Sequence, residues 1–261
     1  MAHLDIHLFG GFQAHLDGQP LSQFESDKVR ALLAYLAVET GCPHRRESLA
    51  ALLWPNRPDP NARTNLRRSL CDLRRVIADA EGSPPFLDIC RQTISINPGA
   101  AVSTDVGTFD RIYRQLSDCI GLPPPGCDPP CEEQAAAAVA LYQGRFLEGF
   151  FLHDSPAFDG WTQRVAERTR RQAATLLAIL ALICAQGDRL PHALHYARRR
   201  AELEPWNEQA HRYLIRLLAQ DGQRAAALRQ YAACRHVLLS ELGVEPEPET
   251  QRLYRELAKT A

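Results

Sequence analysis

Five arginines lie close together in the stretch NARTNLRRSLCDLRRVIA, residues 61–78, which contains a single acidic residue, Asp72. The whole chain has 261 residues and a net charge of −1, so this concentration of positive charge is local. The guanidinium group of arginine forms paired hydrogen bonds with phosphate oxygens and with the edge of guanine. The stretch therefore predicts a helix that contacts DNA, and the competing interpretation is a solvated helix face.

The predicted helix has an apolar stripe that would hold it against its domain. Four aliphatic side chains fall within about 60° of one another on a helical wheel: Leu66, Leu70, Leu73 and Ile77. The polar side chains then point elsewhere, and we expect DNA contacts from Asn61, Thr64, Asn65, Arg67, Arg68 and Arg75. Phosphate contacts set the register on the duplex, whereas contacts to base edges set sequence preference. Arg68, opposite the stripe, is the candidate for reading a base.

Three arginines outside this stretch could add contacts to the backbone of DNA. Arg45 and Arg46 begin a second predicted helix, RRESLAALLWP, whose N-terminus carries partial positive charge that favours phosphate. Arg91 lies at the predicted tip of a hairpin, FLDICRQTISIN, from which it would reach the minor groove or the backbone. Over residues 1–103, however, basic and acidic side chains are equal in number, so affinity must come from their placement.

The order of predicted elements in the first hundred residues is that of a winged helix-turn-helix. Residues 3–9 and 12–16 alternate between apolar and polar side chains, which predicts a small antiparallel sheet. Three short helical patterns and the hairpin follow. In a winged helix-turn-helix the third helix enters the major groove, and the hairpin is the wing.

The second half of the chain is predicted to be helical and carries an internal repeat. The pattern Gly187-x-Arg189, with Tyr196-Ala197 after it, recurs 35 residues later as Gly222-x-Arg224 with Tyr231-Ala232. A period near 34 residues is typical of tetratricopeptide-like helical hairpins, which bury their apolar faces by stacking. The fold class is therefore mainly α. We predict a winged helix over 1–100 and an all-helical domain over 104–261, with an irregular Pro/Cys-rich loop at 117–133.

With both halves placed, the chain resembles transcriptional activators of the SARP (Streptomyces antibiotic regulatory protein) type. These join an OmpR-type winged helix to a bacterial transcriptional activator domain. The N-terminal likeness rests on the blocks LFGGFQAHLDGQPL, KVRALLAYLA, RRESLAALLWP and NLRRSLCDLRRVI, and the C-terminal likeness on ALYQGRFLEGF and LLSELGVEPEPETQRLYREL. The resemblance implies sequence-specific binding to double-stranded promoter DNA and recruitment of RNA polymerase. It leaves open whether the protein forms a homodimer.

Two groups of side chains raise the question of a metal site. Cys119, Cys127 and Cys131 lie in the proline-rich loop, and His153 is a conceivable fourth ligand. Their spacing is not C-x-x-C, so incidental loop cysteines are the preferred interpretation and no metal is predicted. His3, Asp5 and His7 share one strand face, which an exposed strand edge explains equally well.

Other classes of protein find little support in the sequence. It contains no GxxxxGK[S/T], GxGxxG or GxSxG motif, so we expect neither an enzyme nor a bound cofactor. It has no apolar run of transmembrane length and no export signal, so we expect no membrane partner and a cytoplasmic, nucleoid-associated protein. The alternative function is a protein-interaction adaptor that uses the helical repeats and has lost DNA binding.

Overall fold

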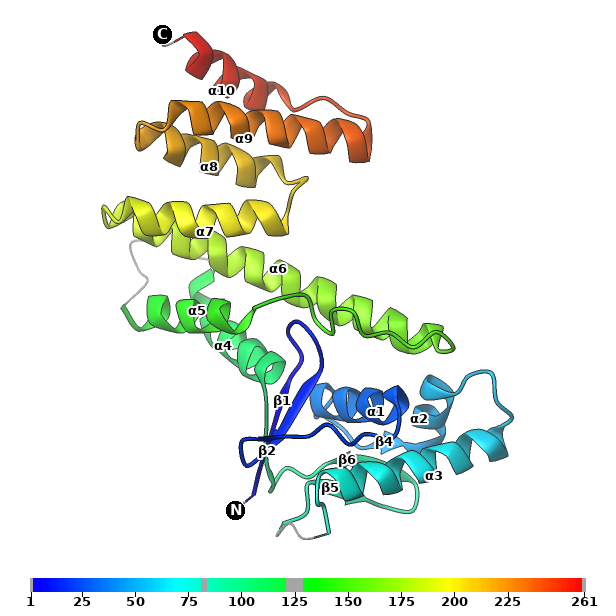
Figure 1. Ribbon diagram of the computed structural model, residues 1–261. Coiled ribbons are helices and arrows are strands. Elements are labelled where there is room, and N and C mark those ends of the chain that lie inside the picture. The colour runs from blue at the N-terminus through cyan, green and yellow to red at the C-terminus, as the bar shows by residue number, and fades with distance from the viewer. Residues whose placement is uncertain (1, 81–83, 121–128, 260–261) are drawn as a thin grey trace. The chain divides into compact units, whose positions relative to one another are not determined.

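The computed structural model describes residues 2–80, 84–120 and 129–259, without the side chains of 117–120 and 129–130. The chain forms two compact units (Figure 1). The N-terminal unit contains Met1–Ile112 and Ala140–Thr169, and the helical unit contains Tyr113–Val139 and Arg170–Ala261.

The N-terminal unit begins with a small sheet whose strand order is β3-β2-β1-β7. Its strands are β1 (His3–His7), β2 (Gln13–Leu16), β3 (Gln19–Pro20) and β7 (Ala101–Thr104). The antiparallel pairing of β1 with β2 confirms the prediction, and Leu4, Ile6 and Leu8 are buried, as their alternation indicates. The parallel pairing of β7 with β1 was not predicted, because β7 is a short strand far away in the sequence.

Three helices and a second sheet follow, in the order expected for a winged helix-turn-helix. The helices are α1 (Asp27–Val38), α2 (Arg46–Leu53) and α3 (Asp59–Val76), and the sheet has the order β4-β6-β5 with β4 (His44–Arg45), β5 (Leu87–Ile89) and β6 (Thr93–Ile96). Pro60 lies in the first turn of α3, where a missing backbone N–H costs little. Asp59 is the first residue of α3 and places a negative charge in its first turn, while the N-cap position is occupied by Pro58.

The predicted apolar stripe of α3 forms part of the core of the N-terminal unit. Leu66, Leu70, Leu73 and Ile77 are all buried. They pack the helix beneath α1 and α2, which contribute further buried aliphatic side chains such as Leu32, Leu36, Leu49 and Leu53. This stripe fixes the rotation of α3 about its own axis. The arginines on the remaining faces are consequently directed away from the core.

The segment 140–169 belongs to the same compact unit as the winged helix, so the units do not follow the division into 1–100 and 104–261 that the sequence suggested. Phe146 forms a β-bridge with Phe9, and the backbone N–H of Leu147 donates to the carbonyl oxygen of Leu8 at 2.7 Å. Farther along, the indole N–H of Trp161 donates to Glu39 at 2.8 Å. These contacts cover apolar surface that the winged helix alone would expose.

The first helices after the winged helix contradict part of the predicted irregular loop at 117–133. Helix α4 (Asp105–Ile120) and helix α5 (Pro129–Leu141) extend into the stretch from either side, and only its middle lies outside the described residues. Prolines in the first turn of α5 need no hydrogen-bond partner for a backbone N–H, which is why they are compatible with a helix there. Composition alone therefore overestimated the length of the loop.

The helical unit contains the predicted repeat. After α6 (Pro156–Gln186), part of which belongs to each unit, come α7 (Leu190–Leu203), α8 (Glu208–Gln220), α9 (Arg224–Val237) and α10 (Pro248–Lys259). Successive members of this group, α7 to α10, pack against one another (Figure 1). Small residues such as Ala193, Ala197 and Ala227 are fully buried between them, which allows close helix packing. A π-helical turn, Leu238–Leu242, connects α9 to the segment before α10.

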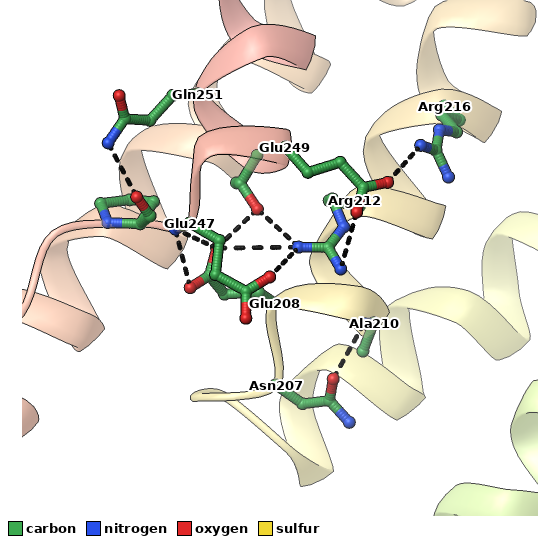
Figure 2. Close-up of polar contacts among 10 residues, drawn as sticks. Asn207, Glu208, Ala210, Arg212, Arg216, Glu247, Glu249 and Gln251 are labelled. Atoms are coloured by element: carbon green, nitrogen blue, oxygen red, sulfur yellow. Dashed lines mark hydrogen bonds and ion pairs between the residues drawn. The ribbon is translucent and has the colours of Figure 1, made fainter.

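Helix α10 is joined to α8 by a set of charged and polar side chains, here called the α8–α10 polar cluster, shown in Figure 2. It consists of Glu208, Arg212, Glu247, Glu249 and Thr250. Arg212 donates to the carboxylate of Glu247 at 2.8 Å and to the hydroxyl of Thr250 at 2.9 Å. Glu208 accepts hydrogen bonds from the backbone N–H of Glu247 and the hydroxyl of Thr250. The cluster thus ties the start of α10 to the start of α8.

Candidate nucleic-acid interface

A pocket of about 430 Å³ with a mostly basic lining lies between α2, α3 and the β5–β6 hairpin. We call it the arginine pocket, and its lining residues are Arg45, Arg46, Glu47, Arg63, Leu66, Arg67, Arg91 and Gln92. Four of the predicted DNA contacts are therefore brought together: Arg45, Arg46, Arg67 and Arg91. Five guanidinium groups around one hollow form a strongly anion-attracting surface, although the unit as a whole has balanced charge.

Backbone pairing places the start of α2 beside the hairpin tip. In β4, Arg45 is paired with Thr93 of β6, and the neighbouring residue His44 with Ile94. The backbone N–H of Arg46 donates to the carbonyl oxygen of Gln92 at 2.9 Å, and its guanidinium Nε donates to that of Cys90 at 3.1 Å. These bonds fix Arg45 of β4 and Arg46 of α2 close to Arg91, with which they line the arginine pocket.

The part of α3 that follows the pocket presents further polar side chains. Arg67 and Arg68 are both exposed, and neither makes a hydrogen bond or ion pair within the described part of the chain. Asn61 and Thr64 are exposed as well, whereas Asn65 is only half exposed. The hydroxyl of Thr64 donates to the carbonyl oxygen of Pro60 at 2.9 Å, so its oxygen remains able to accept a hydrogen bond.

Three other arginines of α3 already have carboxylate partners within the protein. Arg74 is paired with the buried Asp79 at 3.0 Å, and Arg63 with Glu47 at 3.2 Å. Arg75, which the sequence placed among the DNA contacts, is paired with the buried Asp72 and lies 3.8 Å from Glu25. Among the arginines of α3, Arg67 and Arg68 are therefore the two whose charge is not neutralised by a carboxylate of the described residues.

The sequence interpretation missed two residues of the pocket that matter for its charge. Arg63 lies four residues before Arg67, and this spacing puts both side chains on the same face of a helix, so helical periodicity could have identified it. Glu47 is the only carboxylate in the pocket lining, and it lies in the first turn of α2. No sequence signal connects Glu47 with Arg63, because their proximity depends on how α2 packs against α3.

The structure contains no metal-binding cluster in its described part. Residues 2–80, 84–120 and 129–259 hold no group of three or more His, Cys, Asp or Glu side chains that could bind a metal ion. Cys127 and the side chain of Cys119 lie outside the described residues, so a site built from them and Cys131 remains untested. On β1, His7 is paired with Asp5 at 2.9 Å, and the Ser103 hydroxyl donates to Asp5 at 2.6 Å.

No helix in the described part of the chain combines the length and the apolar character that a membrane-spanning helix needs.

Comparison with known proteins gives consistent matches over both units. A family model of the bacterial transcriptional activator domain matches residues 130–258. The transcriptional regulatory protein MoaR1 of Mycobacterium tuberculosis is 24% identical over 260 residues, covering 98% of this chain and 79% of MoaR1. The regulatory protein DnrI of Streptomyces peucetius is 23% identical over 263 residues, covering 96% of this chain and 90% of DnrI.

A third relative is similar in both sequence and structure. The transcriptional regulatory protein EmbR of Mycobacterium tuberculosis is 23% identical over 258 residues, and this chain spans 62% of its length. The solved structure of EmbR in complex with a low affinity phosphopeptide matches with a TM-score of 0.74 at 20% identity, covering 99% of this chain and 66% of that one. At this level of identity the likeness shows the fold, a winged helix combined with a helical domain.

Proposed function

This chain belongs to the SARP-type family of bacterial transcriptional regulators, and we propose that its N-terminal unit binds promoter DNA through the arginine pocket and the exposed face of α3. The observation that carries this proposal is the convergence of Arg45, Arg46, Arg67 and Arg91 on one hollow. These side chains come from β4, from α2, from α3, which is the helix that enters the major groove in winged helices, and from the turn between β5 and β6. A merely solvated helix face would not gather arginines from four parts of the fold.

The residues around the pocket have different tasks in this proposal. Arg45, Arg46 and Arg91 contact backbone phosphates on either side of the helix that enters the major groove. Arg67 and Arg68, which project from α3 without internal carboxylate partners, reach base edges, where a bidentate contact to guanine is the commonest specific interaction. Asn61, Thr64 and Asn65 add shorter polar contacts. Arg75 remains paired with Asp72 and contributes to DNA binding only through the positive charge of its guanidinium group.

The experiment measures the affinity of the chain for a promoter duplex that it binds, and for single-base variants of that duplex, by fluorescence anisotropy titration. We expect Arg68→Ala to lose discrimination at one or two base pairs, at a cost of about 1–3 kcal/mol for the preferred base. We expect Arg45→Ala to weaken binding to all duplexes equally. Arg111→Ala is a matched control, because Arg111 is exposed on α4 of the same unit and lies outside the pocket lining.

A salt titration against random duplex separates this proposal from its alternative, an adaptor that has lost DNA binding. Each phosphate contact releases counterions, so DNA binding predicts a steep loss of affinity with rising salt. No measurable binding at low salt, or binding that none of the pocket variants changes, would overturn the proposal. In either case the chain would act through its helical repeats instead.

We further infer that the chain acts by binding and not by catalysis, with the helical unit contributing contacts to the transcription machinery. The bacterial transcriptional activator domain that matches residues 130–258 supports this division of labour. RNA polymerase is the partner that the family resemblance implies. A transcription assay on a bound promoter, with and without the chain, tests this, and the expected result is an increase in transcript that the Arg45→Ala variant lacks.

A further inference from the structure

Six large apolar side chains are exposed among the described residues, and the last four of them lie close together in the sequence. They are Phe151, Trp206, Leu239, Leu242, Val244 and Tyr254. The last four belong to the π-helical turn, the segment after it and α10, all in the helical unit. Single exposed apolar residues need no explanation, whereas a contiguous group of them marks an interaction surface.

This group borders a groove of about 500 Å³ between α9 and α10, here called the α9–α10 groove. Its apolar lining consists of Leu228, Tyr231, Ala232, Leu239 and Tyr254. The rings of Tyr231 and Tyr254 are stacked, with centroids 4.3 Å apart and planes inclined by 16°, so they form one continuous wall. The α8–α10 polar cluster holds α10 in position at the N-terminal end of this helix (Figure 2).

The ion-forming side chains of the lining have a single sign. Arg229 and Arg235 line the groove together with His236, and no carboxylate does. Arg235 is paired with Glu245 outside the lining, through two hydrogen bonds of 2.8 and 2.7 Å. Arg229 and His236 are exposed and form no ion pair with any described residue. The groove therefore combines an apolar floor with a positively charged edge.

We propose that the α9–α10 groove binds an amphipathic helix of a partner protein, one that carries carboxylates beside its apolar side chains. Apolar side chains of such a helix would fill the groove, and its carboxylates would pair with Arg229 and accept a hydrogen bond from His236. Leu242 and Val244, which follow the groove residue Leu239 in the chain, are exposed apolar side chains as well, which favours a protein segment over a small molecule.

The single sign of the charge also argues against a second copy of this chain as the occupant. A two-fold symmetric interface places the same patch on both sides, so it must be complementary to itself. Across such an axis Arg229 would approach other cationic side chains of the groove, and like charges in contact disfavour association. A partner with acidic residues has the complementary charge.

The test begins with selection of 16-residue peptides from an unbiased phage-displayed library on the full chain, without any assumption about their sequence. We expect enriched peptides to combine acidic residues with apolar residues spaced three and four positions apart. The most enriched peptide is then synthesised with a fluorescent label, and its affinity is measured by anisotropy. Enrichment of basic or unpatterned peptides, or no enrichment, would overturn the proposal.

Exposed positions allow variants that leave the fold intact, as circular dichroism would verify. Arg229→Glu and Leu239→Asp should each weaken binding of the labelled peptide by about tenfold or more. Arg198→Glu makes the same charge change on the exposed surface of α7, outside the groove lining, and should alter affinity less than about twofold. Equal affinity of all three variants and the unmodified chain would place the peptide elsewhere and overturn the assignment.

Two results would contradict the proposal by identifying another occupant of the groove. A dimer in sedimentation equilibrium that Leu239→Asp dissociates would identify a second copy, and binding of a labelled oligonucleotide that Arg229→Glu abolishes would identify nucleic acid. The groove lies in the helical unit, and the arginine pocket lies in the N-terminal unit. The groove variants should therefore keep their affinity for duplex DNA, so failure here is distinguishable from failure of the proposed function.

Discussion

Asp72 and Arg75, one turn apart on α3, form an ion pair in which the carboxylate side chain is 2% exposed and the guanidinium side chain 58% exposed. The other carboxylate oxygen of Asp72 accepts the backbone N–H of Glu25 at 3.0 Å. Asp72 thereby links α3 to the segment before α1 and holds one of the arginines predicted to contact DNA. The only acidic residue of the basic stretch has a structural task.

Replacing Asp72 with alanine should destabilise the N-terminal unit. The variant leaves the N–H of Glu25 without its acceptor, and a lost hydrogen bond of this kind costs roughly 1–3 kcal/mol of unfolding free energy. The loss of stability would be measured by urea unfolding, followed through the fluorescence of Trp54 and Trp161. Both proteins would carry Trp206→Phe, which removes the tryptophan of the helical unit, so that the signal reports on the N-terminal unit. Cys71→Ala, at the exposed neighbouring position, is the control and should unfold at the unmodified midpoint.

Glu47 should limit the affinity of the arginine pocket for DNA. Its carboxylate lies 3.2 Å from Arg63 and is the only negative charge in the lining, so it both repels phosphate and neutralises one arginine. In Glu47→Gln we expect severalfold tighter binding to random duplex. The slope of log affinity against log salt should also steepen by about 0.9, as one more phosphate contact would produce.

The control for that change is Asp27→Asn. Asp27 forms a similarly exposed pair with Arg30 on α1, away from the pocket, so its removal alters the total charge by the same amount. Equal slopes for Glu47→Gln and Asp27→Asn would mean that Glu47 acts only through the net charge. That result would contradict a local role in the pocket.

The apolar stripe of α3 was predictable because it depends on local periodicity alone, and all four of its members are buried. The arginine pocket was not, because Arg45 and Arg46 are placed by β4, a strand of two residues with no periodicity to detect. Likewise, the packing of 140–169 against the winged helix depends on nonlocal contacts such as the Phe9–Phe146 bridge. Helix type and order could be inferred from the sequence, whereas the contacts that assemble the site could not.

Arg212 should hold α10 in place. Its side chain is 11% exposed and reaches Glu247 and Thr250, so an apolar replacement leaves a largely buried Glu208 without its neighbouring cation. In Arg212→Met we expect backbone amides of 251–257 to exchange with deuterium about tenfold or more faster, since loss of a buried charge partner costs well over 1 kcal/mol.

Arg216→Met is the matched control for Arg212→Met. Arg216 is 55% exposed and, within the described part of the chain, forms an ion pair only with Glu249; an exposed pair of this kind contributes about 0–1 kcal/mol. In Arg216→Met the backbone amides of 251–257 should therefore exchange with deuterium at rates close to those of the unmodified chain. If the two variants exchanged at the same rate, the position of α10 would depend on its apolar contacts with α9 instead.

His211 should make the stability of the helical unit depend on pH. Its Nε2 lies 2.9 Å from the carbonyl oxygen of Pro205, which can only accept, so Nε2 carries the proton and Nδ1 accepts from the amide of Gln230 at 2.7 Å. Burial lowers the pKa of His211 below its ordinary value, and the Pro205 hydrogen bond and the Glu208 carboxylate oppose this only in part. The folded state thus favours neutral histidine.

The sign of the pH effect follows from this lowered pKa. The unfolded chain takes up a proton near pH 6.5 and the folded chain only at lower pH, so the stabilising contribution is complete above about pH 6.5 and is lost as the pH falls through the folded-state pKa. Urea unfolding at pH 7.5, 6.5 and 5.5 should show it, with a slope of at most about 1.4 kcal/mol per pH unit. His211→Gln keeps a donor and an acceptor but cannot titrate, and should remove this part of the slope. The control is His236→Gln, at an exposed position of α9, which should leave the slope of unfolding free energy against pH unchanged. If His211→Gln also left that slope unchanged, another group would be responsible for it.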